Sequence, residues 1–223
     1  MHAEAGDDRV RVIVFAKAPR PGLAKTRLIP ALGPQGAAAL AQRMLEHTLD
    51  AAVAAGLGPV ELCAAPDARD VLLQEAARAH GVALAEQGEG DLGARMHRAF
   101  ARHLGSATMP GALLIGTDAP ALDAARLRDA AQALQGHDAV FVPALDGGYA
   151  LVGLKRPDAR VFGGMSWSHD RVLADTRTRL AAAGLRWVEL PPVADIDEPP
   201  DLIHLPVAWR STLNTDLSPF TGA

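Results

Sequence analysis

The sequence has little cysteine, no long apolar run and no excess of positive charge. Cys63 is the only cysteine among 223 residues, which excludes a disulfide within one chain and a cysteine-rich zinc site. No apolar stretch approaches a membrane span, and the first residues lack the basic and apolar regions of a secretory signal. A formal net charge of -4 offers no basic surface to nucleic acid or anionic lipid. We therefore expect a cytoplasmic protein that acts on small molecules, without a membrane span or a nucleic-acid partner.

The sequence also lacks the two common nucleotide-binding motifs. Neither G-x-x-x-x-G-K-[ST] nor G-x-G-x-x-G occurs in it. There is no internal repeat, and nothing specifies an oligomeric state. With 49% hydrophobic residues the chain can bury a sizeable core, which favours one α/β domain.

Short apolar runs alternate with amphipathic stretches along the chain. A β-branched run at 10–16 predicts a strand, and apolar spacings of three and four predict a helix from Pro34 to Gly56. The alternation indicates a mainly parallel sheet with helices on both faces, in a single domain over residues 9–205 with terminal tails at 1–8 and 206–223. Further strands are expected at 59–65, 82–85, 112–115, 138–143, 150–154 and 185–190. Helices are expected to begin after caps at Asp67, Asp91, Asp123 and Ser168, and a short one at 201–205.

The loop at 17–28 carries four cations, two prolines and one glycine within twelve residues. Its local positive charge suits a phosphate, because cationic side chains form strong charge-assisted hydrogen bonds with phosphate oxygens. Gly22 allows close backbone approach, and Pro21 stiffens the loop. A solvated basic loop without a ligand is the alternative.

The apolar run at 112–115 breaks at Gly116 and is followed by Thr117 and Asp118. A carboxylate at the end of a buried strand lies where ligands of open α/β folds collect, and it can hold a hard cation. Pro120 forces a turn before the next helix. The alternative is that Asp118 caps this helix, although Asp123 is better placed to do so.

Glycines recur at two further strand ends. The Asp146-Gly147-Gly148 turn is typical of a hairpin, and its glycines can also expose backbone amides to a ligand while Asp146 accepts hydroxyl hydrogen bonds. The glycine-rich segment at 87–93 admits a ligand or simply connects two elements. From the helix that follows it, Arg95 can reach back over the crevice.

The last third of the chain contains further polar candidates. Trp167 can form a platform for a ring-shaped acceptor or pack in the core, and His169 can bond the acceptor or merely begin a helix. Asp195 and Asp197 point the same way on an extended segment and are candidate ligands to a cation shared with Asp118. Helix capping by Asp197 or Glu198 is the competing interpretation.

Two long strings resemble a known family. Residues 15–28, Phe-Ala-Lys-Ala-Pro-Arg-Pro-Gly-Leu-Ala-Lys-Thr-Arg-Leu, and residues 143–154, Pro-Ala-Leu-Asp-Gly-Gly-Tyr-Ala-Leu-Val-Gly-Leu, resemble the GT-A nucleotide-diphospho-sugar transferase superfamily. The match is to a bacterial glycosyltransferase-like branch, some members of which are associated with arsenosugar biosynthesis. The resemblance covers about residues 9–205 and implies a Rossmann-like GT-A fold. It also implies a nucleotide over the carboxyl ends of the sheet, with Mg²⁺ or Mn²⁺ on Asp118.

These assignments define a predicted site. Nucleotide contacts are expected at Ala16, Lys17, Pro21, Gly22, Lys25, Arg27, Arg95 and Thr117. Acceptor contacts are expected at Gly147, Gly148, Trp167 and His169. The metal ligands are expected to be Asp118 with Asp195 or Asp197, and the base that activates the acceptor Asp146 or Asp197.

The leading hypothesis is glycosyl transfer from a nucleoside diphosphate sugar to a small acceptor. Many GT-A glycosyltransferases present Asp-x-Asp, whereas Ala119 and Pro120 follow Asp118 here. That departure resembles members that transfer a nucleotidyl group, including enzymes of molybdenum-cofactor and deazaflavin-cofactor synthesis. A nucleotidyltransferase that couples a nucleoside triphosphate to a phosphorylated small molecule and releases pyrophosphate is therefore the second hypothesis. A nucleotide-binding module without turnover is the third.

Overall fold

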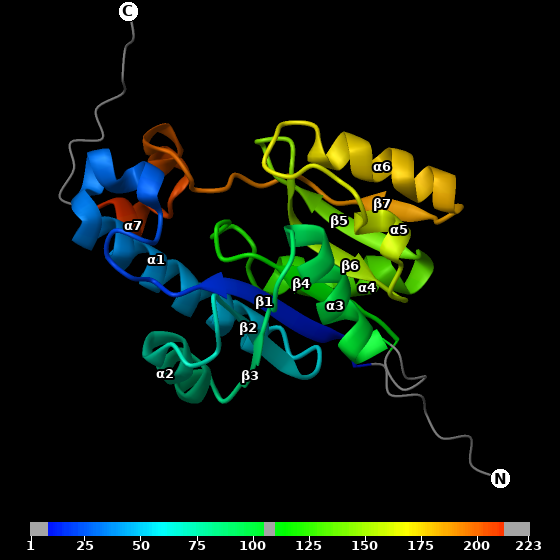
Figure 1. The fold of residues 1–223 in the computed structure, drawn as a ribbon, viewed down its shortest axis with the longest axis horizontal. Helices are drawn as coiled ribbons and strands as arrows, with labels where there is room; N and C mark the ends of the chain where they lie inside the picture. The colour runs from blue at the N-terminus through cyan, green and yellow to red at the C-terminus, as the bar shows by residue number, and fades with distance from the viewer. Residues whose placement is uncertain (1–8, 105–109, 212–223) are drawn as a thin grey trace, which may run out of the picture.

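The computed structural model describes residues 9–104 and 110–211 and contains one seven-stranded sheet (Figure 1). The strand order is β3-β2-β1-β4-β6-β5-β7, so the short strands β3 and β7 form the two edges. Only β6 runs antiparallel to its neighbours, which confirms the expected mainly parallel sheet. The strands are β1 (Arg11–Lys17), β2 (Val60–Ala65), β3 (Ala83–Glu86), β4 (Ala112–Ile115), β5 (Ala139–Pro143), β6 (Tyr149–Leu154) and β7 (Trp187–Glu189).

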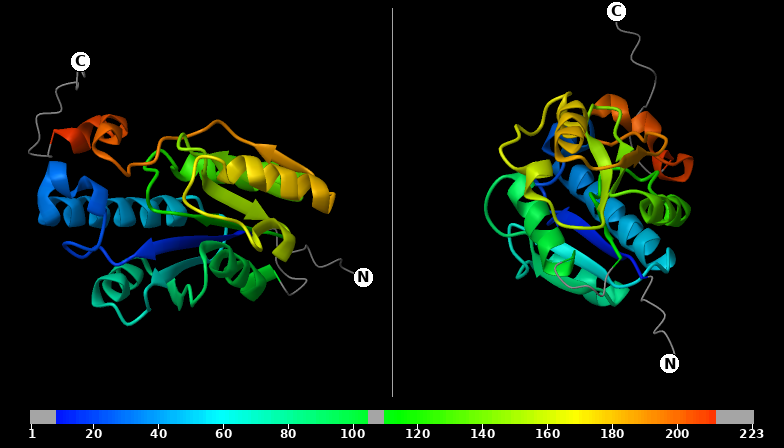
Figure 2. Two further views of the ribbon diagram at one scale, coloured as in Figure 1. Left: turned by 45° about the horizontal axis from the view of Figure 1, so that its top comes forward. Right: turned by 90° about the vertical axis from the view of Figure 1, so that its right-hand side faces the viewer.

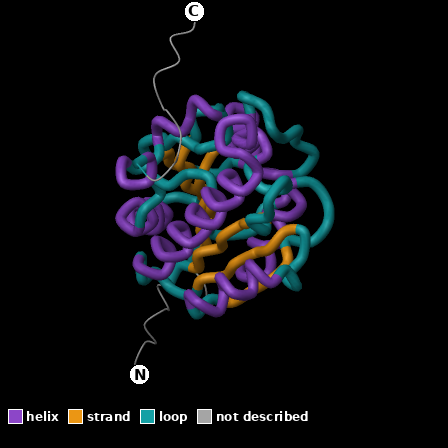
Figure 3. Tube along the Cα trace, turned by 90° about the vertical axis from the view of Figure 1, so that its left-hand side faces the viewer, coloured by secondary structure: helices purple, strands orange, loops and turns teal. Residues whose placement is uncertain are grey.

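Helices cover both faces of this sheet, as the alternation predicted. One apolar core packs Leu49 of α1 and Leu127 of α4 against the sheet, and the other packs Phe100 of α3 and Phe162 of α5 against the opposite face. The end-on view in Figure 2 and the tube in Figure 3 show the strands between these two helical layers. The helices are α1 (Ile29–Ala54), α2 (Val71–His80), α3 (Leu92–Leu104), α4 (Ala124–Gly136), α5 (Ala159–Phe162), α6 (Val172–Ala183) and α7 (Val207–Arg210), with 3-10 turns η1 (Thr26–Leu28) and η2 (Pro199–His204).

Helix α1 begins earlier than predicted. It starts at Ile29 and is kinked at Gly33, whose φ of 68° and ψ of 166° are not helical. Pro34 follows directly, and a proline inside a helix removes one backbone hydrogen bond. The prediction placed the start of the helix at Pro34 because a glycine followed by a proline, here Gly33 and Pro34, is typical of a helix boundary.

All four predicted helix caps can be checked. Asp91 accepts a hydrogen bond from the backbone N–H of Ala94 at 2.8 Å, which confirms it as the cap of α3. Asp123 accepts a hydrogen bond from the backbone N–H of Arg126, which confirms it as the cap of α4. The cap of α2 is Asp70 rather than Asp67, because Asp70 accepts from Leu72 N–H while Asp67 accepts from Arg69 N–H in the preceding turn. Ser168 is not the cap of α6. It has a φ of 64°, and the helix begins four residues later at Val172.

The segment after β7 crosses back along the sheet and ends beside the first half of α1 (Figure 1). The expectation of an irregular tail from 206 is wrong for residues 207–210, which form α7. Trp209 is 9% exposed, packs with Leu40 and Met44 of α1, and lies 4.6 Å below the guanidinium of Arg43. The predicted tails at 1–8 and 212–223 lie outside the described residues. None of the described helices is both long and apolar enough to cross a membrane.

Candidate functional site

A cleft of about 710 Å³ lies at the carboxyl ends of the parallel strands. Residues that follow β1 and β4 line one side of it, and residues that follow β5 line the other. Ligands of open α/β sheets bind at this edge, because the loops there converge on one crevice. The predicted residues that line the cleft are Ala16, Lys17, Lys25, Arg27, Arg95, Thr117, Asp118, Asp146, Gly148, Trp167, His169, Asp195 and Asp197.

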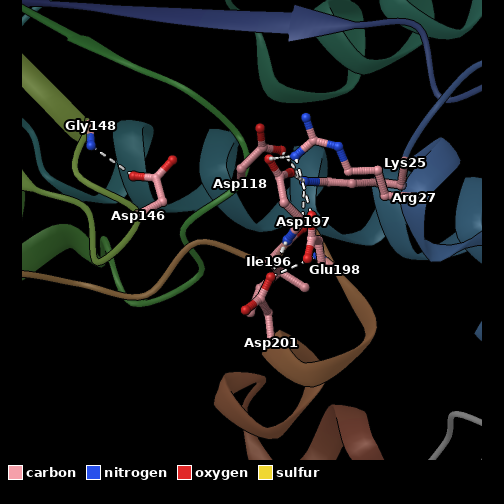
Figure 4. Close-up of polar contacts among 9 residues, drawn as sticks. All are labelled: Lys25, Arg27, Asp118, Asp146, Gly148, Ile196, Asp197, Glu198 and Asp201. Atoms are coloured by element: carbon pink, nitrogen blue, oxygen red, sulfur yellow. Dashed lines mark hydrogen bonds and ion pairs between the residues drawn. The ribbon is translucent and has the colours of Figure 1, made fainter. Parts of the chain in front are cut away.

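Lys25 is the centre of the polar contacts in the cleft (Figure 4). Its Nζ lies 2.6 Å from Asp118 Oδ1 and 2.9 Å from Asp197 Oδ1, and it donates to the carbonyl oxygen of Ile196 at 2.6 Å. Burial by itself would lower the pKa of Lys25, but the charges of Asp118 and Asp197 outweigh burial and raise this pKa. The lysine is therefore charged, and one ammonium compensates two carboxylates.

The turn after β4 and the segment at 195–197 are joined directly. The backbone N–H of Ile196 donates to the carbonyl oxygen of Asp118 at 2.8 Å, which holds Asp118 and Asp197 on the same side of Lys25. The structure thus brings together the two segments that were assigned to one site from the sequence. The alternative that Asp118 caps the following helix is wrong, because Asp123 caps it.

The other carboxylates lie toward the second half of the cleft, beyond β5. Asp146 lies apart from Lys25 and accepts from Gly148 N–H at 2.8 Å (Figure 4). Burial, followed by the charges of Asp146 and Asp197, raises the pKa of Asp195 to about 6. Asp146, Asp195 and Asp197 also line an adjoining hollow of about 320 Å³, together with Glu198 and Asp201. This half of the site carries an excess of negative charge.

The carboxylates of the cleft fit a divalent cation that is bound partly by the protein and partly by a ligand. They do not form a complete coordination shell of protein atoms. Within the described residues no group of three His, Cys, Asp or Glu side chains is close enough to hold a metal ion, so Asp118, Asp195 and Asp197 are not gathered into one preformed cluster. The carboxylates of Asp118 and Asp197 are 49% and 40% exposed and offer hard oxygen atoms to the cleft. Mg²⁺ is commonly bound through one or two carboxylates together with substrate phosphates.

Two residues of the predicted nucleotide set lie outside the cleft lining. Pro21 and Gly22 are exposed at the tip of a turn, in which the N–H groups of Leu23 and Ala24 donate to the carbonyl of Arg20. This tight turn directs the tip to solvent and brings the later part of the loop, with Lys25 and Arg27, into the cleft. Arg27 is 64% exposed and lies 3.8 Å from both Asp197 and Glu198.

The Asp146-Gly147-Gly148 turn connects β5 and β6 in a β-hairpin. This is the first of the two interpretations that the sequence allowed. Gly147 has a φ of 92° and packs against the backbone of Asp170, where a Cβ would overlap the carbonyl oxygen. Its carbonyl accepts from Leu173 N–H at 2.9 Å. Gly147 therefore joins the hairpin to the start of α6 and is not part of the cleft lining, whereas Gly148 is.

Trp167 and His169 lie on the segment that closes the cleft beside α6. The indole packs against the α3 backbone, because a Cβ on Gly93 would lie 2.8 Å from the Trp167 ring. His169 Nε2 donates to Ser166 O at 3.1 Å and its Nδ1 accepts from Arg171 N–H at 3.1 Å. Both residues thus line the cleft and stabilise this segment at the same time.

One buried polar residue of the cleft was not singled out from the sequence. Gln87 is 5% exposed and directly follows β3. Its side chain contacts the ends of two other strands and Arg95. The only sequence signal was its position between a strand end and the glycine-rich segment.

Several solved structures of similar fold are described as transferases of nucleotidyl groups or nucleotide-activated sugars. A candidate nucleotide-diphospho-sugar transferase from Desulfovibrio desulfuricans G20 matches with 29% identity over 93% of this chain and 89% of that chain, with a TM-score of 0.80. A CMP:2-keto-3-deoxy-manno-octonic acid synthetase complexed with CTP matches with 12% identity over 91% and 97% of the two chains, with a TM-score of 0.57. A cytidylyltransferase from Leptospira borgpetersenii matches with 14% identity over 86% and 83%, also with a TM-score of 0.57.

The fold is therefore that of the GT-A nucleotide-diphospho-sugar transferase superfamily, as the sequence strings indicated. Within it, the chain belongs to the family described as uncharacterized proteins conserved in bacteria, DUF2064, whose sequence model matches residues 48–169. A comparison with curated proteins found no match. The matches together support a transferase that uses a nucleotide.

Proposed function

We propose that this protein is a metal-dependent glycosyltransferase that moves a sugar from a nucleoside diphosphate sugar to a small acceptor. The observation that carries the proposal is the division of charge in the cleft. Lys17, Lys25 and Arg27 supply cations at the end of β1 and in the loop that follows it, and Asp146 and Asp195 add negative charge in the half beyond β5. Cations placed where negative charge develops stabilise a diphosphate leaving group in the transition state.

Asp118 and Asp197 would hold the cation, because their half-exposed carboxylates lie close together, each in contact with Lys25 Nζ. When bound, Mg²⁺ or Mn²⁺ would neutralise charge on the leaving diphosphate. Lys25 and Arg27 would contact the same phosphate oxygens through charge-assisted hydrogen bonds. Lys17, the last residue of β1, and Thr117, which follows β4, would complete the donor side.

Asp146 would accept the proton from an acceptor hydroxyl group. It is exposed, lines the cleft, and is oriented by the hydrogen bond from Gly148 N–H. Trp167 and His169 would bound the acceptor on the side of α6. The carboxylates of this half would repel a phosphorylated acceptor, since like charges in a partly buried site disfavour one another. This repulsion favours an uncharged acceptor and hence glycosyl transfer.

A specific observation keeps nucleotidyl transfer as the second candidate. The turn after β4 offers Asp118 alone, followed by Ala119 and Pro120, instead of a pair of aspartates. The same cations would then stabilise a pyrophosphate leaving group.

The test is to identify the leaving group. The protein would be incubated with Mn²⁺, a mixture of polyol acceptors, and either UDP-glucose and GDP-mannose or the four nucleoside triphosphates. We expect release of a nucleoside diphosphate only in the presence of an acceptor. The Asp146→Asn variant should bind the donor but lose turnover. Release of pyrophosphate from a triphosphate would instead establish nucleotidyl transfer.

A further inference from the structure

Three arginines on one face of α3 hold the glycine-rich segment that follows β3. Arg98 donates to the carbonyl oxygens of Gln87 at 2.7 Å and Glu89 at 2.9 Å, and Arg102 donates to Glu86 O at 3.2 Å. A Cβ at Gly88 would lie 2.6 Å from Arg98 Nη1, so the glycine permits this close approach. The backbone around Gln87 is therefore fixed.

The side chain of Gln87 makes three hydrogen bonds within the protein. Its Nε2 donates to Cys63 O of β2 at 3.0 Å and to Ala16 O of β1 at 3.4 Å, and its Oε1 accepts from Arg95 Nη1 at 3.1 Å. Its backbone N–H donates to Ala64 O. A buried amide that is bonded on both its nitrogen and its oxygen has a fixed orientation, and it fixes the geometry of its neighbours in turn.

Arg95 differs from Lys25 and Arg27, two other cations of the cleft, in the groups that it contacts. Lys25 and Arg27 each lie within 4 Å of carboxylates, whereas Arg95 makes no ion pair with the described residues. Its two contacts are with neutral oxygens, Gln87 Oε1 and the carbonyl of Asp91. Its guanidinium is therefore not held in an ion pair at the cleft wall, and it keeps N–H groups for a ligand.

The structure assigns to Gln87 the role of a positioning residue, which holds Arg95 at the cleft wall so that Arg95 can bind a phosphate group of the donor. The inference rests on the proposed use of a nucleotide donor and specifies where part of its negative charge is bound. A guanidinium held in a fixed orientation loses less conformational freedom on binding an anion, which increases affinity.

Inorganic pyrophosphate is the probe, because it carries the anionic group without a base or sugar. Its affinity would be measured by titration calorimetry for the wild type, Arg95→Ala, Gln87→Met and Arg128→Ala. Arg128 lies on α4, does not line the cleft, and controls for the loss of one positive charge. We expect a loss of about 10- to 100-fold for Arg95→Ala, about 3- to 10-fold for Gln87→Met, and no change for Arg128→Ala.

The double variant separates positioning from general damage. Gln87→Met alone should weaken pyrophosphate binding relative to the wild type. The double variant Gln87→Met/Arg95→Ala should bind pyrophosphate as weakly as Arg95→Ala alone, since Gln87 acts through Arg95. An equal loss in both backgrounds would overturn the positioning role. Gln87→Glu provides a second variant if Gln87→Met unfolds, which circular dichroism would reveal. The carboxylate introduced by Gln87→Glu should neutralise Arg95 and weaken pyrophosphate binding. If this variant bound pyrophosphate with wild-type affinity, the inference would be overturned.

The outcomes for wild type separate this inference from the proposed function. If the wild type binds pyrophosphate and nucleoside diphosphates but Arg95→Ala binds pyrophosphate equally well, only the present inference fails. If the wild type binds neither pyrophosphate nor any nucleoside di- or triphosphate, the proposed function fails as well.

Discussion

Lys25 and Asp118 form an ion pair of 2.6 Å between the loop after β1 and the turn after β4. The sequence predicted that a divalent cation would lie beside Asp118, whereas the structure places an ammonium there. The same ammonium also contacts Asp197. Asp118 and Asp197 thus already share one positive charge before any ligand binds, and a bound metal ion would share them with Lys25.

Lys25 and Arg27 should differ in their effect on stability. Lys25→Met leaves Asp118 and Asp197 without their common partner and should cost roughly 1 to 2 kcal/mol, since both carboxylates are partly solvated. Arg27→Met should change stability by less than about 0.5 kcal/mol, because Arg27 is 64% exposed. Both should weaken nucleotide binding by roughly 1 to 3 kcal/mol. Urea unfolding and titration calorimetry with UDP and CTP would measure these effects, and equal stability of the two variants would contradict the role given to Lys25.

Asp118→Asn should remove most of the stabilisation that Mn²⁺ adds to the nucleotide-bound protein. An amide oxygen is a weaker ligand for a hard cation than a carboxylate. The loss of the pair with Lys25 should cost only about 0.2 to 1 kcal/mol, because the Asp118 side chain is 49% exposed. The measurement is thermal unfolding with UDP, with and without Mn²⁺. Asp123→Asn is the matched control, since asparagine also caps helices well, and it should keep the metal effect.

Gly147→Ala should destabilise the fold by roughly 3 kcal/mol or more. It combines a positive φ with an overlap between the new Cβ and the backbone of Asp170. Gly164→Ala separates the two causes, because Gly164 has a φ of 62° but open space around it, and should cost only about 1 to 2 kcal/mol. Chemical denaturation would compare them, and similar losses would show that the contact with Asp170 is unimportant.

Glu61 should make stability depend on acid pH. Burial by itself would raise the pKa of this carboxyl, but hydrogen bonds from Cys63, His103 and Arg102 outweigh burial and hold the pKa below its ordinary value of 4.5. A depressed pKa in the folded state stabilises the fold above the unfolded value and loses this effect as the pH falls through the folded value.

Glu61→Gln should therefore cost roughly 2 kcal/mol near neutral pH and progressively less below about pH 4.5. Urea unfolding across this range would measure the difference. Glu46→Gln, at an exposed position on α1 whose carboxylate accepts from Gln42, is the control and should show little change at either pH. A cost for Glu61→Gln that does not vary with pH would contradict this account.

Much of the fold could be predicted because it depends on local patterns. Apolar runs such as Val12–Val14 are buried on both faces of a parallel sheet and so read as continuous hydrophobic strands. The insertion of β6 between β4 and β5 could not be predicted, because strand order follows from pairing between distant residues. The choice of Asp70 over Asp67 as a cap was equally inaccessible, since both stand before the same apolar run.

Only part of the site could be predicted from the sequence. Residues that follow parallel strands are expected at the carboxyl edge of the sheet, but their contacts with one another are not. Asp118 and Asp197 meet because each lies on a segment at the carboxyl edge of the sheet. The charge balance through Lys25 depends on its left-handed backbone conformation, with a φ of 47°, which nothing in the local sequence indicates. The role of Gln87 required knowledge of which backbone carbonyls surround it.

The two edges of the sheet limit how this protein can associate with other chains. β3 has four residues and β7 has three, so few backbone groups are available at either edge for pairing with a further strand. Another polypeptide that extended the sheet would gain only a short ladder of hydrogen bonds. Aggregation through pairing of sheet edges is thereby disfavoured. A stable complex with a second copy would have to use the helical surfaces instead.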